Sequence, residues 1–365
     1  MSSVTRALLD GLRVLDLSLW QPGHTATQLL ADLGADVVKI EPPGGDRMRP
    51  LVDRFYNFNG HKRSRVLDLK DAAGRRQLLD LVVEADVVVE NFRPGVADRL
   101  GVGFADLVAV NPAIVMCSIT GFGQTGPLAN VPGHDHNYQA YAGAFTFPQD
   151  GTPEPSALLV GDQGSGTAAA FAILAGVLCA RRTGEGEHID VAIADILAAW
   201  VAPFGSIDPA RAESPGDVST LPGMGEFRTA DGRYVELGVY SENHLWDALC
   251  DAIGLTQHVG VDMAGRTASA ARLRADIAGR IEEWTRDDLV ELLTRCSVPA
   301  APILTRGEML EHPNFLRRGV FETGPDGHRV VGHPITYAVH PALPSGRPPG
   351  LDEHPDAHFG PRPGP

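Results

Sequence analysis

Short apolar runs alternate with stretches of helical periodicity through the first 120 residues, and this alternation constrains the fold more than any other feature. The runs at 87–89 and 114–116 are continuously apolar, which is typical of strands that are buried on both faces. Such strands occur in parallel sheets that are covered by helices on both sides. The expected strands are 13–17, 36–41, 86–90 and 113–119, and the expected helices are 24–33, 72–84 and 104–110. The sequence therefore predicts an open α/β domain.

A second unit is expected after a small-residue helix at 164–181 and a stretch rich in proline and glycine at 203–225. An Asp231-Gly232 turn between two short β-like runs predicts a hairpin there. Helical patterns follow at 242–253, 269–281 and 286–296, with a further strand at 298–304. Proline and glycine are dense from 341 to the end, which favours an extended tail.

Composition excludes several classes of protein. The four cysteines among 365 residues form no CxxC pair, so a zinc ribbon or a disulfide scaffold is not expected, and a reducing cytoplasm is the expected compartment. The first residues do not resemble a signal peptide, and no uninterrupted apolar run reaches the roughly 18 residues of a membrane span. The net charge of −15 argues against nucleic acid as a partner.

The charge is unevenly distributed along the chain. Residues 1–100 hold 14 basic and 14 acidic side chains, so the negative excess belongs to the remainder. Within 39–65, seven basic residues stand against three acidic ones. This segment is either a site for a small anionic ligand or a solvated surface.

Three short motifs are candidates for chemistry. The GxGxxG pattern at 121–126 is followed by Pro127 and Pro132 rather than by a helix, which favours a tight loop over a dinucleotide site. Two histidines and an aspartate at 134–136 stand in a loop, where they are a surface cluster, a catalytic group or, least favoured, a metal site. Asp162 is flanked by glycines before an apolar helix, so it is either an N-cap or a carboxylate in a ligand pocket.

Taken together, many segments in order resemble the class III CoA-transferase (CaiB/BaiF-type) family, which includes the α-methylacyl-CoA racemases. The matching segments, which span about 11–320, include GLRVLDLS, LLADLGADVVKIEPPGGDRMR, NGHKRSRVLDLK, ADVVVENFRPGVADRLG, RRTGEGEHIDVAIAD and SVPAAPILTRGEMLEHPNFLRRG. The resemblance implies a large Rossmann-like domain over 1–205 completed by 305–365, a linker at 206–224, and a small α+β domain at 225–304. It also implies an interlocked homodimer in which the proline-rich tail wraps the partner.

The family binds coenzyme A, which is anionic, as part of its thioester substrate and needs no permanent cofactor or metal. By resemblance, the basic side chains expected to contact CoA are Lys39, Arg47, Lys62, Arg63 and Arg93.

The resemblance leaves two reactions open. In a racemase, Asp162 and His134 remove and return the α-proton of a 2-methylacyl-CoA, and Glu242, or Ser241 in an ungapped count, supports the histidine. In a transferase, Asp162 is a nucleophile that takes the acyl group as an anhydride. GHDHNY resembles the racemase segment that carries the histidine, so we expect a racemase first and a CoA-transferase as the alternative.

Overall fold

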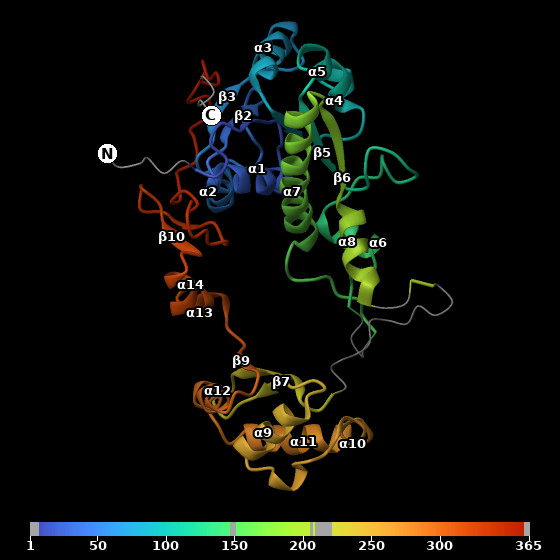
Figure 1. Ribbon diagram of the computed structural model, residues 1–365, viewed down its shortest axis with the longest axis vertical. Coiled ribbons are helices and arrows are strands. Elements are labelled where there is room, and N and C mark those ends of the chain that lie inside the picture. The colour runs from blue at the N-terminus through green and yellow to red at the C-terminus, as the bar shows by residue number, and fades with distance from the viewer. Residues whose placement is uncertain (1–6, 147–150, 205–206, 209–220, 361–365) are drawn as a thin grey trace. The chain divides into compact units, whose positions relative to one another are not determined.

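The computed structural model describes residues 7–146, 151–204, 207–208 and 221–360. Its contacts divide the chain into two units, Met1–Pro203 with Pro313–Pro365, and Phe204–His312 (Figure 1). Most of the linker expected at 206–224 lies outside the described residues.

The large unit is built on a six-stranded sheet in the order β3-β2-β1-β4-β5-β6, and all neighbouring strands are parallel. The strand order reverses direction between β1 and β4, which is the arrangement of a doubly wound sheet. The prediction of a parallel α/β fold is confirmed. The strands are β1 (Arg13–Asp16), β2 (Asp36–Glu41), β3 (Arg63–Val66), β4 (Val87–Glu90), β5 (Val115–Thr120) and β6 (Glu187–Ala192).

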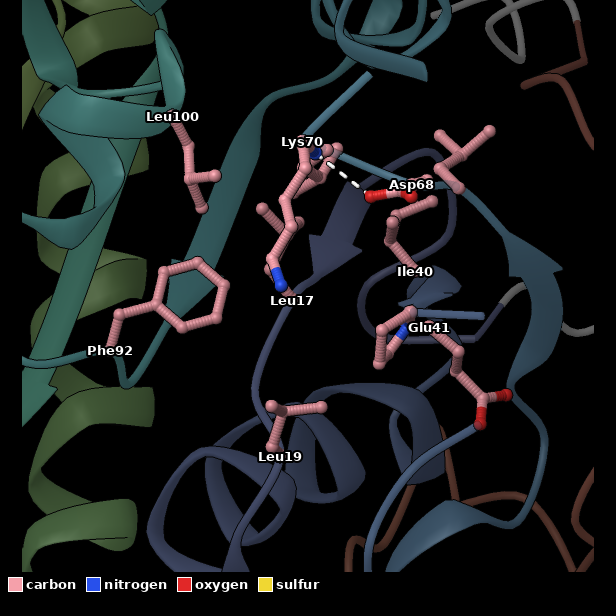
Figure 2. A pocket seen from close by; sticks show the side chains of 11 residues that line it. Leu17, Leu19, Ile40, Glu41, Asp68, Lys70, Phe92 and Leu100 are labelled. Atoms are coloured by element: carbon pink, nitrogen blue, oxygen red, sulfur yellow. Dashed lines mark hydrogen bonds between the residues drawn. The ribbon is translucent and has the colours of Figure 1, made fainter. Parts of the chain in front are cut away.

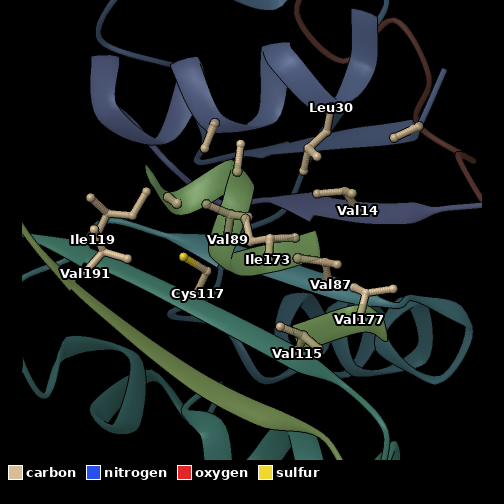
Figure 3. Packing of buried hydrophobic residues seen from close by; sticks show 14 of the residues in the cluster. Val14, Leu30, Val87, Val89, Val115, Cys117, Ile119, Ile173, Val177 and Val191 are labelled. Carbon is tan, nitrogen blue, oxygen red and sulfur yellow. The ribbon is translucent and has the colours of Figure 1, made fainter. Parts of the chain in front are cut away.

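Alternate side chains of the central strands enter two separate cores. Figure 3 shows one face, where Val87 and Val89 meet Leu30 of α1 (Gln21–Asp32) and Ile173 of α7 (Val160–Thr183). The intervening Val88 enters the opposite core, which is covered by α3 (Ala72–Glu84) and α5 (Phe104–Val110). Both faces of the sheet are therefore covered, which explains why these strands read as continuous apolar runs.

Helix α7 approaches its neighbours so closely that the glycines of its first turns are required. A methyl group at Gly166 would lie 2.6 Å from the carbonyl oxygen of Pro22 in α1. One at Gly164 would lie 2.3 Å from the ring of Trp200 in α8 (Ile193–Val201). The two glycines therefore give α1 and α8 the room to pack closely against α7.

The proline-rich tail packs on its own large unit as far as it is described. The His354 amide donates to the Ser64 carbonyl at 2.9 Å, and Arg65 donates to the Ala357 carbonyl at 3.1 Å. Ala357 and Phe359 are buried in the core beneath α3. Edge strand β3 of the same chain therefore holds this part of the tail, and a contact between the tail and a partner stays a prediction.

The smaller elements of the large unit lie around the sheet. They are α2 (Val52–Asn59), α4 (Val96–Leu100), α6 (Asp135–Tyr141), α14 (Pro313–Arg317), β10 (Phe321–Thr323) and β11 (Arg329–Val331). By length and composition alone α7 could cross a membrane, but half of its most apolar window is buried inside the protein. It is the central packing element of one sheet face.

The second unit packs helices against a three-stranded antiparallel sheet. Its core includes Trp246 and Leu289. The predicted hairpin at Asp231-Gly232 is confirmed by the pairing of Phe227 with Val235. Its elements are β7 (Met224–Arg228), β8 (Tyr234–Gly238), β9 (Ala300–Pro302), α9 (Asn243–Ala252), α10 (Met263–Ala268), α11 (Ala270–Ile281), α12 (Arg286–Arg295) and α13 (Arg306–Leu310).

Candidate active site

Asp162 lies in the first turn of α7 and is half-buried. The helix N-cap is Leu159, and the Asp162 amide donates to Oδ2 of Asp135 at 2.7 Å, so the alternative that Asp162 is itself the N-cap is wrong. Burial, followed by the charge of Asp135, raises the pKa of Asp162 to about 7, and the positive charge of Arg54 acts in the opposite direction. Near neutral pH this carboxyl group is therefore present both as an acid and as a nucleophilic anion.

His134 immediately precedes this carboxylate contact. It is the exposed N-cap residue of α6, and the next residue is the buried Asp135 that receives the Asp162 amide. The fold thus brings the backbone of His134 beside the start of α7, although His134 and Asp162 are 28 positions apart in the sequence.

Tyr138 connects Asp162 electrostatically to Arg93, which follows β4. Burial and the charges of Asp162 and Asp135 raise the pKa of Tyr138 to about 12, whereas the charge of Arg93 acts to lower it. The tyrosine hydroxyl donates to the Gly133 carbonyl at 2.5 Å. Arg93 and Asp162 therefore lie within electrostatic range of the same phenol.

The GxGxxG loop has a structural role beside this tyrosine. A methyl group at Gly121 would lie 2.3 Å from the Tyr138 ring, and the Gln124 amide donates to Asp190 at 2.8 Å. No helix begins between Gly121 and Asp135, so the interpretation of a tight loop is confirmed. In the part of the chain that the structure describes, no group of three or more His, Cys, Asp or Glu side chains is arranged to hold a metal ion.

Glu242 belongs to the second unit. It is exposed and is the N-cap residue of α9, although its side chain does not cap the helix. Ser241 is not the cap either, and its carbonyl accepts a hydrogen bond from Arg266 at 3.1 Å. Glu242 and Ser241 therefore belong to a different unit from Asp162.

Lys39 is fully buried and already paired. Its Nζ lies 2.7 Å from Asp46 Oδ2, 2.9 Å from the Ser18 carbonyl oxygen and 2.9 Å from His24 Nε2. Burial, together with the charge of Lys39, lowers the pKa of His24 to about 4, so the imidazole is neutral at pH 7. This network joins the segments that follow β1 and β2.

Lys62 is buried in a second network. Its Nζ donates to Asp16 at 2.9 Å, to Thr27 at 2.8 Å and to Asn59 at 3.1 Å. Burial lowers its pKa to about 8, although the adjacent Asp16 carboxylate favours the charged form. Lys62 thereby ties the end of α2 to β1 and α1.

Most of the basic segment is occupied by protein partners rather than open to a ligand. Arg63 pairs with Asp36 at 2.7 Å, Arg49 pairs with Glu41 at 2.5 Å, and Arg65 bonds to the tail. Arg47 and Arg54 are exposed. The sequence offers two alternatives for residues 39–65, a ligand site and a solvated surface. Neither alternative describes the segment as a whole.

A pocket lies at the carboxyl ends of four strands, next to the position where the strand order reverses. Figure 2 shows Phe92 and Leu100 on one side of it and Ile40, Glu41 and Asp68 on the other. Such crevices bind nucleotides in doubly wound sheets. The complete lining is Leu17, Leu19, Ile40, Glu41, Pro42, Leu67, Asp68, Leu69, Lys70, Phe92 and Leu100.

Sequence reasoning missed this pocket, because its walls come from separate segments that only the sheet brings together. The available signal was position: most of the lining residues stand at or immediately after the end of a strand.

Comparison with known proteins places the chain in a family. The sequence profile of CoA-transferase family III matches residues 9–355. The chain belongs to CoA-transferase family III. It is 35% identical to succinyl-CoA:mesaconate CoA-transferase of Haloarcula marismortui, covering 95% of this chain and 94% of that protein. It is 34% identical to acetyl-CoA:oxalate CoA-transferase of Acetobacter aceti, covering 94% and 93%.

A solved structure agrees with the fold. A CAIB/BAIF family protein from Brucella suis superposes with a TM-score of 0.85 at 31% identity, covering 96% of this chain and 97% of that one. The resemblance to the family is confirmed, and this family III protein is an enzyme that acts on acyl-CoA thioesters. The names of its relatives favour the transferase alternative, and the first expectation, a racemase, finds no support among them.

Proposed function

We propose that this family III protein is a CoA-transferase that moves CoA between carboxylic acids through Asp162. The observation that carries the proposal is the half-buried Asp162 carboxyl group, whose pKa is about 7, in the unit that also holds a nucleotide-type pocket. The activities named for its relatives agree with this choice.

The reaction uses Asp162 as a nucleophile. The ionised carboxylate attacks the thioester carbonyl, the C–S bond breaks, and CoA leaves as a thiolate while an aspartyl-acyl anhydride forms. The thiolate then attacks the aspartyl carbonyl, which releases the first acid and leaves CoA on Asp162. A second carboxylate displaces this CoA to form a new anhydride, and the thiolate attacks the new acyl group to give the product thioester.

The pocket at the sheet edge fits the adenine of CoA. Phe92 and Leu17 supply apolar contacts, and Lys70, which is exposed at the rim, is available for a phosphate group. Arg93 adjoins the pocket through Phe92 and acts on Tyr138 near Asp162, so it is placed to hold CoA along the route between them.

The five basic residues expected from the resemblance divide into two groups in this proposal. Arg47 and Arg93, which are exposed, keep the role of contacting CoA phosphates. We reassign Lys39, Lys62 and Arg63 to holding the surrounding segments, since their charges are paired within the protein.

We further propose a homodimer. Phe171 and Leu178 of α7 are 76% and 69% exposed, which is unusual for apolar side chains on the central helix of a large unit. A second copy covering this face would bury them, and light scattering of the purified protein tests the mass directly. The cytoplasm stays the proposed compartment, in agreement with the four free cysteines.

One experiment separates the two reactions. Purified protein is incubated in D2O with a 2-methylacyl-CoA, with and without an acceptor acid. We expect CoA transfer that depends on the acceptor and on Asp162, and no deuterium at the α-carbon. Deuterium incorporation without an acceptor would instead support the racemase, in which His134 keeps its proposed acid–base role and Glu242 its proposed role of supporting the histidine.

A second pair of variants completes this test. Asp162→Asn should abolish transfer, whereas His134→Ala should leave most of it, because the transferase route assigns no step to an imidazole. Orders-of-magnitude loss in His134→Ala would contradict the transferase proposal.

A further inference from the structure

Helix α2 is clamped against the β10–β11 hairpin of the same unit. Asp53 pairs with His328 at 3.2 Å, Tyr56 donates to Asp326 at 2.5 Å, and the Val331 amide donates to the Asn57 side chain at 2.9 Å. Its last residue is tied to β1 through Lys62, as described above. The backbone of α2 is therefore fixed along its length.

Arg54 stands in the middle of this clamp. It is exposed, and among the described residues no carboxylate lies within 4 Å of its guanidinium group. The residue before it pairs with His328, and the residue after it, Phe55, is buried beneath the Arg49 guanidinium at 4.4 Å. Arg54 is thus a cation on a fixed stretch of backbone, without an ion-pair partner in the described chain.

The position of α2 brings Arg54 toward Asp162. Helix α1 packs against both α2 and α7, and Thr25 of α1 donates to Gln163, the neighbour of Asp162, at 3.3 Å. The charge of Arg54 favours the ionised form of Asp162. Arg54 therefore lies within Coulomb range of the reacting carboxylate without forming an ion pair with it.

The site has an electrostatic requirement that Arg54 meets. Asp162 and Asp135 place two carboxylates at the start of α7, so an acyl group that carries its own carboxylate would be repelled there. Arginine binds carboxylates through two parallel hydrogen bonds, and its planar guanidinium group loses less entropy per hydrogen bond than a lysine does. Among the described residues, Arg54 is the cation whose charge acts on Asp162.

We propose that Arg54 selects acyl groups that carry a second carboxylate, binding that carboxylate while the thioester carbonyl lies at Asp162. The substrate class is therefore a dicarboxylic acid and its mono-CoA thioester. This inference rests on the proposed function, since it concerns the acid that Asp162 activates. Arg93 and Arg47 stay assigned to CoA.

The test compares succinyl-CoA with butyryl-CoA as donors to one common acceptor acid. The two acyl groups have the same chain length, but succinyl ends in a carboxylate and butyryl in a methyl group. Arg54→Gln should lower kcat/KM for succinyl-CoA about 10- to 100-fold, because a charge-assisted contact is lost. The same variant should change kcat/KM for butyryl-CoA less than about threefold. Arg54→Lys should recover part of the loss, because lysine keeps the positive charge but cannot form the two parallel hydrogen bonds of a guanidinium group.

The ratio of the two donors isolates the contact. Loss of Arg54 also changes the ionisation of Asp162, but that effect is common to both donors and cancels in the ratio. Arg47→Gln is the matched control. It should lower kcat/KM for both donors to the same extent, because both donors carry CoA.

The outcomes distinguish the two proposals. Wild-type protein that transfers CoA, with Arg54→Gln affecting both donors equally, overturns the inference and leaves the proposed function standing. Wild-type protein that prefers butyryl-CoA also overturns it. Wild-type protein without acid-dependent transfer from either donor contradicts the proposed function itself, and the inference with it.

Discussion

Neutralising Asp162 should stabilise the protein at alkaline pH. The pKa of this residue lies at about 7 in the folded protein, against 3.8 for an ordinary aspartate. The folded state therefore holds a proton that the unfolded state releases, so stability falls as the pH rises from about 4 through 7. Each pKa unit corresponds to about 1.4 kcal/mol, so wild-type protein should lose on the order of 4 kcal/mol relative to Asp162→Asn across this range.

Urea unfolding at pH 4.5 and pH 8.5, followed by circular dichroism, measures this difference. The free energy of unfolding of Asp162→Asn minus that of wild type should increase by about 3 to 4 kcal/mol between the two pH values. Gln163→Asn is the control, because it alters the adjacent position without removing a titrating group. Equal differences at both pH values would refute the argument that burial and Asp135 disfavour the Asp162 anion.

Three other predictions concern the catalytic carboxylate, the buried network and the pocket. Because the nucleophile must be ionised, kcat/KM for the thioester should fall below an apparent pKa near 7, and a rate that is flat from pH 5 to 8 would contradict this. Lys62→Met leaves Asp16 buried without its cation and should destabilise the protein by about 3 kcal/mol in urea unfolding, whereas unchanged stability would show that the pair is dispensable. Phe92→Ala should raise the Kd for CoA in calorimetry about tenfold through lost apolar contact, and an unchanged Kd would remove the pocket from the CoA site.

The sequence predicted the strands that are buried on both faces and missed those at the sheet edges. Strands β1, β2, β4 and β5 are apolar because helices cover both their faces. Strand β3 has the sequence Arg-Ser-Arg-Val, and its polar side chains bind the tail. Strand β6 is largely exposed. Polar edge strands carry little apolar periodicity, so only the fold reveals them.

Within the site, sequence reasoning found the residues that stand in short motifs. Asp162 and His134 belong to local glycine-bearing patterns, and the fold brings their segments together through Asp135. The resemblance predicts that Lys39 and Lys62 contact CoA, and that contact stays a prediction. Both side chains form buried ion pairs, which a sequence does not distinguish from cations at a surface. The full buried contacts of both side chains emerge only from tertiary structure.

The Asp162 capping hypothesis failed for a related reason. A carboxylate in the first turn of a helix is usually a capping group, but here Asp135 occupies that role from a different helix. That replacement leaves the Asp162 side chain free of a capping bond to its own helix, which is compatible with the nucleophilic role proposed for it.

In the proposed mechanism Asp162 becomes covalently bonded to the acyl group during CoA transfer, and oxygen-18 labelling detects that bond. Succinate labelled in both carboxylates is incubated with the protein and succinyl-CoA, and the peptide that contains Asp162 is analysed by mass spectrometry. The proposed mechanism predicts that oxygen-18 enters the Asp162 carboxylate as CoA exchanges, one oxygen in each turnover. CoA exchange with no label in that peptide would contradict it.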